Sequence, residues 1–214
     1  MLKPDEIIIL HTTPYSEKSM VIHTLSKTYG RRSFLVKNAG RYITQFQPLN
    51  ILECIIAENP KSSLFTAKDF STSVPLSGIR CSAGKNAISM FVAEILLRAL
   101  QEGEGESGLF EWCTEEIRIL DALKQDYANF HLRFLLDFAG ALGFRPDLES
   151  LLPFLDSSAM VVSEFMSRDF SAAMLVPMNG RERSEICRKI LDYLEFHLES
   201  RLNIRSLAVL SELF

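Results

Sequence analysis

The hydrophobic pattern of the chain changes its period near residue 80, and this change limits what the chain can fold into. Before it, apolar residues form short runs such as DEIIILHT, KSMVIHTLSKTYG and RRSFLVKNAG, which are typical of strands. From residue 83 onward, apolar residues recur every three or four positions, as they do in amphipathic helices. The sequence therefore predicts an α+β protein of two modules, a β domain at 1–78 and a helical domain at 79–214.

The first module contains five strand-like runs and no pattern long enough for a helix. Tyr29-Gly30 separates two of the runs and is a hairpin signal, and Asn59-Pro60 provides a turn between the last two, PLNILECIIAENP and SLFTAKDF. Five strands in about 70 residues favour a small closed barrel, of which the oligonucleotide-binding (OB) barrel is one type. A small sandwich or an SH3-like barrel fits the pattern nearly as well.

The second module has a helical pattern in four places. We expect helices over about 83–100, after the sequence GEGESG, from about Tyr127 to Gly143, and over 181–200, with a short last helix capped by Ser206. The third of these is apolar almost all round, which is typical of the buried centre of a bundle. Residues 144–179 are predicted to be irregular.

Charge is distributed unevenly along the chain, whose net charge is −4. Residues 1–80 hold ten basic and six acidic residues, a net +4, whereas residues 81–214 hold thirteen and twenty-one, a net −8. No Asp or Glu occurs between Glu17 and Glu53, although six Lys and Arg do. A basic first module and an acidic second module indicate two modules with different partners.

Aromatic residues are interleaved with the cations of this acid-free window. Such a strip suits a sugar-phosphate backbone and unstacked bases, although basic residues also keep an exposed strand edge soluble. Strand alternation places Phe34 on the same face as Val36, so Phe34 is favoured as a core residue over a stacking residue. The candidate DNA-binding residues are Lys18, Lys27, Tyr29, Arg31, Arg32, Phe34, Lys37 and Arg41.

No pattern in the sequence assembles a catalytic or metal site, and we expect neither an enzyme nor a cofactor. GIRCSAGK at 78–85 fails the phosphate-loop signature both in its glycine spacing and in the residue after Lys85. The four cysteines are far apart, which indicates neither disulfides nor zinc, and the four histidines lack metal-ligand spacing. Without a signal peptide or an apolar run of membrane-spanning length, a cytoplasmic protein is expected.

Several ordered segments resemble the RecO family of bacterial recombination mediators. PYSEKSMVIHTLSKTYGRRSFLVKNAG is similar to that family's N-terminal pattern, with Tyr15, Glu17, Ser19, Gly30 and Lys37 at matching places. FQPLNILE resembles its Gln-Pro-Leu strand opening, and FHLRFLLDFAGALGFRP resembles its central helix. KILDYLEFHLESRLNIRSLAVLSEL resembles its C-terminal segment, so the resemblance covers nearly the whole chain.

The chain departs from the family pattern in two places. Asn38 stands where the family continues its Lys-Gly motif, and only Arg41 remains of the basic cluster that follows. Many members carry a four-cysteine zinc finger after the central helix, but DLESLLPFLDSSAM contains no cysteine. We therefore predict no zinc, and a DNA affinity that is reduced or reshaped.

The resemblance implies binding to single- and double-stranded DNA, strand annealing, and loading of RecA onto strands coated by single-stranded DNA-binding protein. It implies RecR and the C-terminal tail of single-stranded DNA-binding protein as partners, and a location at the nucleoid. Arg133 is a candidate for pairing with the tail's carboxylate, although an i,i+4 pair with Asp137 is favoured. A protein–protein adaptor with a degenerate barrel and an RNA-binding barrel protein remain alternatives.

Overall fold

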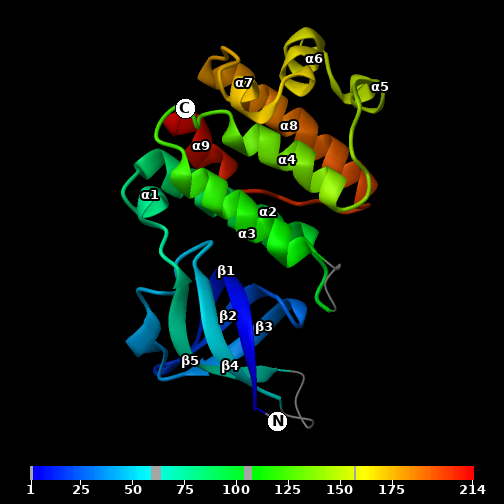
Figure 1. Cartoon of the computed structure of the whole chain (residues 1–214). Coiled ribbons are helices and arrows are strands. Elements are labelled where there is room, and N and C mark those ends of the chain that lie inside the picture. The colour runs from blue at the N-terminus through cyan, green and yellow to red at the C-terminus, as the bar shows by residue number, and fades with distance from the viewer. Residues whose placement is uncertain (1, 59–63, 104–107, 157) are drawn as a thin grey trace. The chain divides into compact units, whose positions relative to one another are not determined.

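A computed structural model describes residues 2–58, 64–103, 108–156 and 158–214 of the chain (Figure 1). The chain forms two compact units: unit 1 joins Met1–Ser77 to Ala93–Arg118, and unit 2 joins Gly78–Val92 to Ile119–Phe214. Helices α2 (Ala83–Ala99) and α3 (Leu109–Ala122) each contribute residues to both units. The predicted domain boundary at residues 78 and 79 stays a prediction.

Five strands between Leu2 and Val74 form a closed barrel, as the sequence predicted. Its strands follow the order β1-β2-β3-β5-β4, in which β3 and β5 are parallel and the other neighbours are antiparallel. This closed order is that of an OB-like barrel and excludes the sandwich. The turn predicted at Asn59-Pro60 lies outside the described residues. The strands are β1 (Leu2–Ser16), β2 (Ser19–Ser26), β3 (Gly30–Lys37), β4 (Ile51–Ala57) and β5 (Phe65–Val74).

Strand β1 closes the barrel because it is long enough to pair with two strands. Residues 2–8 pair with β4, and residues 7–16 pair with β2. The register between β1 and β2 shifts twice, between Ile9 and His11 and between Pro14 and Ser16. Such irregularities bend a strand and redirect its side chains.

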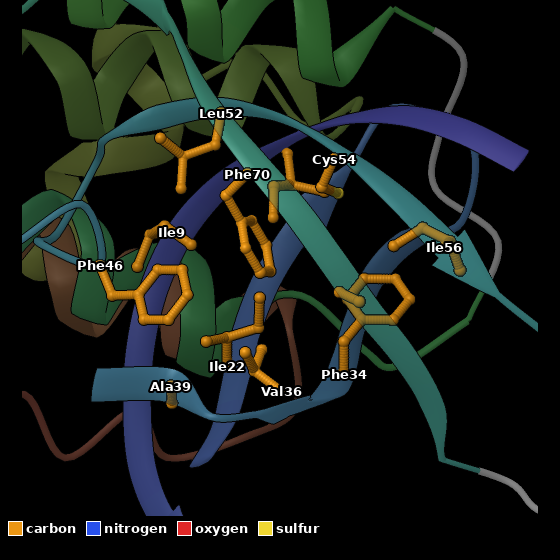
Figure 2. Packing of buried hydrophobic residues seen from close by; sticks show 12 residues of the cluster. Ile9, Ile22, Phe34, Val36, Ala39, Phe46, Leu52, Cys54, Ile56 and Phe70 are labelled. Atoms are coloured by element: carbon orange, nitrogen blue, oxygen red, sulfur yellow. The ribbon is translucent and has the colours of Figure 1, made fainter. Parts of the chain in front are cut away.

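The barrel core is built from alternate residues of every strand (Figure 2). Phe34 and Val36 of β3 point inward, and Leu52, Cys54 and Ile56 of β4 do the same. Because side chains alternate along a strand, the residues between them face outward. The outward positions of β3 are therefore Arg31, Ser33, Leu35 and Lys37.

Two positions around β3 require a left-handed backbone. Gly30, which begins β3 after the predicted hairpin turn, has a φ of 63°, a conformation that glycine adopts without steric cost. Asn38 follows β3 with a φ of 52° and precedes the short helix η1 (Ala39–Tyr42). Asparagine tolerates this conformation better than most residues. Asn38 therefore meets the backbone requirement that a glycine would meet at this position.

Unit 2 is helical, and α4 (Phe130–Ala141) is buried almost all round, as predicted. Figure 1 shows α4 running beside α8 (Gly180–His197), and these two helices are in contact. The side-chain amide of Asn129 donates to three carbonyls at 173–176, and its oxygen accepts from Arg183 Nε at 2.9 Å. The C-terminal helix α9 (Leu207–Leu213) begins after Ser206, as predicted.

The prediction that residues 144–179 are irregular is wrong. Their described part contains α5 (Leu148–Leu151), η2 (Leu152–Phe154), α6 (Ala159–Ser167) and α7 (Phe170–Met174). These helices have nine residues or fewer, which is too short for a helical period to stand out in the sequence. Asp147 and Asp169 cap α5 and α7 by accepting hydrogen bonds from Ser150 N and Ala172 N. One further short helix, α1 (Ser77–Arg80), was not predicted from the sequence.

Candidate nucleic-acid interface

The predicted basic strip divides into two groups that lie at opposite ends of β3. Lys27, Arg31 and Arg32 lie at its beginning, in the turn before it and in its first residues. Lys18, Lys37 and Arg41 lie at its end, in the β1–β2 turn, the last residue of β3 and η1. Six residues of strand separate Arg31 from Lys37, which corresponds to about 20 Å.

Lys18, Lys37 and Arg41 form what we call the free basic end. Ser19 pairs with both Ser16 and Lys37, so the β1–β2 turn lies beside the end of β3. The amide of Ala39 donates to the carbonyl of Lys18 at 3.1 Å, which holds the start of η1 against the same turn. All three cations are exposed, and in the described part of the chain none forms an ion pair, although Glu17 lies in the same turn.

Tyr15 is an exposed aromatic residue at the same end, and it was not among the predicted DNA-binding residues. Its side chain is 66% exposed. It lies where the β1–β2 register shifts, between Pro14 and Ser16, two residues before the turn. In the sequence, Tyr15 lies only three residues before the cation Lys18, and this spacing could have marked it as a candidate for base stacking. Strand alternation does not predict the direction in which a side chain points at a bulge.

Lys27, Arg31 and Arg32 form what we call the paired basic end. Lys27 Nζ lies 3.3 Å from Glu111 Oε1, and Arg31 Nη1 lies 3.3 Å from Glu102 Oε1. All four residues belong to unit 1. The window that lacks acids in the sequence therefore has acids beside it in the fold, because carboxylates 71 and 84 positions later in the sequence pair with Arg31 and Lys27.

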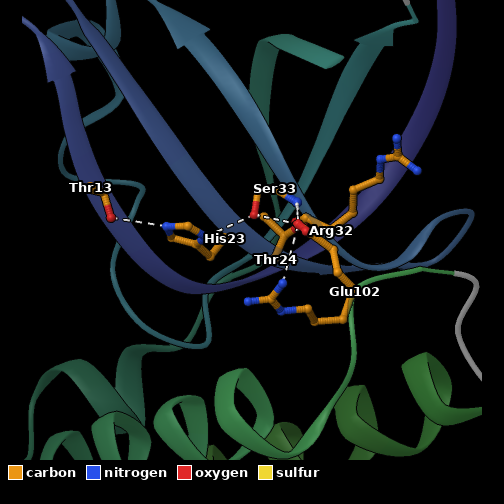
Figure 3. Close-up of polar contacts among 7 residues, drawn as sticks. Thr13, His23, Thr24, Arg32, Ser33 and Glu102 are labelled. Atoms are coloured by element: carbon orange, nitrogen blue, oxygen red, sulfur yellow. Dashed lines mark hydrogen bonds and ion pairs between the residues drawn. The ribbon is translucent and has the colours of Figure 1, made fainter. Parts of the chain in front are cut away.

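Glu102 has the most partners of these acids (Figure 3). Its Oε1 accepts from the Ser33 amide at 3.2 Å and from Ser33 Oγ at 2.8 Å, in addition to facing Arg31. The amide of Gly103 donates to the Arg31 carbonyl at 3.1 Å, which anchors the backbone beside Glu102. Three donors thus converge on one carboxylate oxygen on the outer face of β3.

His23 extends this network across the sheet (Figure 3). Its Nδ1 lies 2.9 Å from Ser33 Oγ and its Nε2 lies 3.0 Å from Thr13 Oγ1. Burial of the ring, together with nearby His11 and Arg31, lowers the pKa of His23, so the neutral form is favoured near pH 7. The single proton of the Ser33 hydroxyl goes to Glu102, so Ser33 must accept from His23 Nδ1–H.

This arrangement is not a catalytic triad. In a triad, histidine accepts the proton of serine and the acid orients the other nitrogen of histidine. Here Ser33 accepts from His23, the acid bonds Ser33, and Thr13 occupies the second nitrogen of His23. Thr13 donates to His23, His23 donates to Ser33, and Ser33 donates to the Glu102 carboxylate, which is the final acceptor.

Arg32 lies on the opposite face of β3 from Arg31, at one end of the barrel core. Its guanidinium lies 4.2 Å from the centre of the Phe65 ring and 5.8 Å from that of Tyr29. The Tyr29 hydroxyl donates to Glu58 at 2.8 Å, and burial together with Glu58 raises the pKa of Tyr29 to about 12. Tyr29 is therefore held among protein groups, which disfavours the predicted role in stacking on a base.

Phe34 is a core residue, and its burial disfavours the stacking role that placed it among the candidate DNA-binding residues. It has no exposed surface and packs among the inward residues of the barrel. No base can contact its ring while the barrel stays folded. Its alternation with Val36 had already favoured this position.

Arg133 forms the i,i+4 pair that the sequence favoured. Its Nε donates to Asp137 Oδ2 at 2.6 Å, and its Nη1 donates to the carbonyl of Arg168 at 3.3 Å. An apolar cavity of about 460 Å³ lies elsewhere in unit 2, between the end of α3 and α7, and Arg133 does not line it. Its lining includes Ile119, Leu123, Lys124, Phe170, Met174 and Leu175.

Comparison with known proteins agrees with this architecture. Residues 1–73 match the family model "Recombination protein O N terminal", and residues 82–151 match "Recombination protein O C terminal". The chain is 32% identical to the DNA repair protein RecO of Bacteroides fragilis and to that of Phocaeicola vulgatus, with all of each chain covered. It is 28% identical to the DNA repair protein RecO of Flavobacterium johnsoniae over 97% of both chains.

The chain belongs to the RecO family. The N-terminal RecO match ends within β5 and so covers almost the whole barrel. The C-terminal match runs from just before α2 to the end of α5. The resemblance drawn from sequence motifs is thereby confirmed.

The zinc finger of many RecO proteins does not fit the residues of this chain. Cys54, Cys113 and Cys187 are buried on β4, α3 and α8, and Cys81 is exposed after α1. Burial raises the pKa of Cys54 to about 12, which disfavours the thiolate that a metal requires. Within the described ranges, no three His, Cys, Asp or Glu side chains gather closely enough to hold a metal ion.

In the same part of the chain, no helix is long and apolar enough to cross a membrane.

Proposed function

We propose that this protein acts in DNA repair and recombination by binding single-stranded DNA at the free basic end of its barrel. The observation that carries the proposal is that Lys18, Lys37 and Arg41 are exposed cations without ion pairs in the described part of the chain. Membership of the RecO family supports the same role. The position of Tyr15 at this end adds an aromatic ring that a base can stack on.

Phosphate contacts at this end would supply most of the affinity. Each neutralised phosphate of a single strand contributes about 0.7 to the slope of log affinity against log salt concentration. Three contacts give a slope near −2, so raising salt from 50 to 200 mM should weaken binding by about 20-fold. Double-stranded DNA also offers phosphates, but its stacked bases would not use Tyr15.

The experiment that tests this proposal compares charge reversals at the two ends of β3. The triple variant Lys18→Glu, Lys37→Glu, Arg41→Glu should lose binding of a labelled single strand, measured by fluorescence anisotropy. Reversal of three exposed arginines of unit 2, Arg181 and Arg188 of α8 and Arg201 after it, is the matched control and should retain it. Retained affinity in the first variant would contradict the assignment. Parallel titration with RNA of the same sequence tests the RNA-binding alternative.

We further propose that the protein anneals strands and helps load RecA, with RecR and single-stranded DNA-binding protein as partners. The net charge of −8 over residues 81–214 disfavours contact with DNA and supports protein contacts there. The apolar cavity beside α7 has Lys124 on its lining, so it suits an apolar C-terminal tail whose carboxylate pairs with an amine. Arg133 is the weaker candidate for this role because Asp137 already holds it.

A further inference from the structure

We propose that the Ser33 amide and hydroxyl, with the Arg31 guanidinium, form a phosphate subsite that Glu102 occupies until nucleic acid displaces it. We call these three groups the anion site. The inference rests on the proposed function, because the phosphate belongs to the nucleic-acid strand bound at the free basic end. It adds a second contact region, at the opposite end of β3, and a carboxylate that competes for it.

The geometry of the site is that of a receptor for an oxygen anion. A backbone amide, a hydroxyl and a guanidinium reach Glu102 Oε1 at 3.2, 2.8 and 3.3 Å. Phosphate oxygens in protein–DNA complexes are bound by these same kinds of donor. A phosphate oxygen at the position of Oε1 would keep all three contacts without any change in the protonation of Ser33 or His23.

Arg31 has donor capacity that Glu102 does not use. Its Nε is buried and has no hydrogen-bond partner among the described residues, and its side chain is only 19% exposed. Glu102 engages only its Nη1, at the long distance of 3.3 Å. A phosphate has more acceptor oxygens than a carboxylate, and bidentate pairing with arginine is a common geometry. Phosphate can therefore satisfy this guanidinium better than Glu102 does.

Glu102 is held loosely enough to be displaced. Its side chain is 56% exposed, so water competes for its contacts and weakens its ion pair with Arg31. The sequence EGEGESG at 102–108 contains three acids, one of them Glu102, and no base. The phosphates of a bound strand would therefore repel Glu102. A strand already held at the free basic end, about 20 Å away, would present further phosphates at high effective concentration.

The test uses the full-length protein and a labelled single strand, with anisotropy titrations of single and double variants. Glu102→Ala removes the competing acceptor and should tighten binding roughly 3- to 10-fold. Glu53→Ala is the control, because it removes one exposed carboxylate from β4, another strand of the same barrel, and should change affinity less than twofold.

A double-mutant cycle then separates the site from a general effect of charge. Ser33→Ala in the otherwise wild-type protein should change the affinity for DNA little. The Ser33 hydroxyl donates to the Glu102 carboxylate before binding and to a phosphate after it, so its removal costs one hydrogen bond in each state. In the Glu102→Ala background, Ser33→Ala should weaken binding roughly threefold or more, because only the phosphate contact is lost. Additive effects, or a Glu102→Ala variant no tighter than Glu53→Ala, would overturn the anion site while leaving the proposed function standing. Absence of binding in wild type and Glu102→Ala alike would overturn both.

Discussion

Burial decides which of the aromatic residues of the barrel can contact a base. Phe34 and Tyr15 are both near cations in the sequence, but Phe34 has no exposed surface and Tyr15 is 66% exposed. The sequence pattern identified the acid-free window without distinguishing between them. Tyr15 lies at the register shift between Pro14 and Ser16, where strand alternation does not predict the direction of a side chain.

Alanine substitutions at these two positions should therefore have opposite effects. Phe34→Ala leaves a cavity in the barrel core and should lower the free energy of unfolding by about 3–5 kcal/mol, as measured by urea denaturation. Tyr15→Ala should leave stability within about 0.5 kcal/mol of wild type but weaken single-strand binding by about 1–3 kcal/mol. A Tyr15→Ala variant with unchanged affinity would remove this residue from the interface.

His131 should make the stability of the protein depend on pH. It is buried on α4, and burial, reinforced by Arg183, lowers its pKa from 6.5 to about 3. Between these two values the unfolded chain binds more protons than the folded protein, so the free energy of unfolding falls as pH is lowered.

The prediction is that the urea midpoint is lower at about pH 5 than at about pH 7.5, and that His131→Gln reduces this difference. Glutamine cannot take up a proton in the unfolded chain, so the linkage through this residue disappears. The comparison is between pH values within each variant, so a general loss of stability in His131→Gln does not affect it. An unchanged pH dependence in His131→Gln would assign the effect to other groups.

At the scale of elements, the sequence predicted those parts whose pattern repeats several times. Five strand runs gave the barrel, and α4 was recognisable because apolar residues surround it. The helices between 148 and 174 were missed, because an element of three to nine residues shows fewer than three turns of its period. Their signals were instead local, namely the capping residues Asp147 and Asp169.

The candidate interface, too, could be predicted only where its signal is local in the sequence. The cations of the strip were predictable from composition, and their division between the two ends of β3 follows from the strand length. The pairing of Arg31 with Glu102 was not predictable, because these residues lie 71 positions apart and no local rule connects them. Contacts of this kind follow from packing within unit 1 and not from a sequence pattern.

For the molecule as a whole, the uneven charge predicts two binding surfaces that can be altered independently. The cations proposed for DNA lie on the barrel, whereas the apolar cavity and Lys124 belong to unit 2. The two groups of residues belong to separate compact units and share no residue. A charge change confined to the lining of the cavity should therefore leave DNA binding unaffected.

Lys124→Glu provides the test of this independence. The variant should weaken binding of the C-terminal peptide of single-stranded DNA-binding protein roughly 3- to 10-fold, because the peptide carboxylate loses its cation and meets an acid. Affinity for single-stranded DNA should stay within twofold of wild type. Arg188→Glu, an exposed change of the same size on α8, should alter neither. Calorimetry with the peptide and anisotropy with DNA measure the two affinities on the same preparations. Peptide binding that is unchanged in Lys124→Glu would exclude the cavity as the tail site, and a parallel loss of DNA binding would show that the two surfaces are coupled.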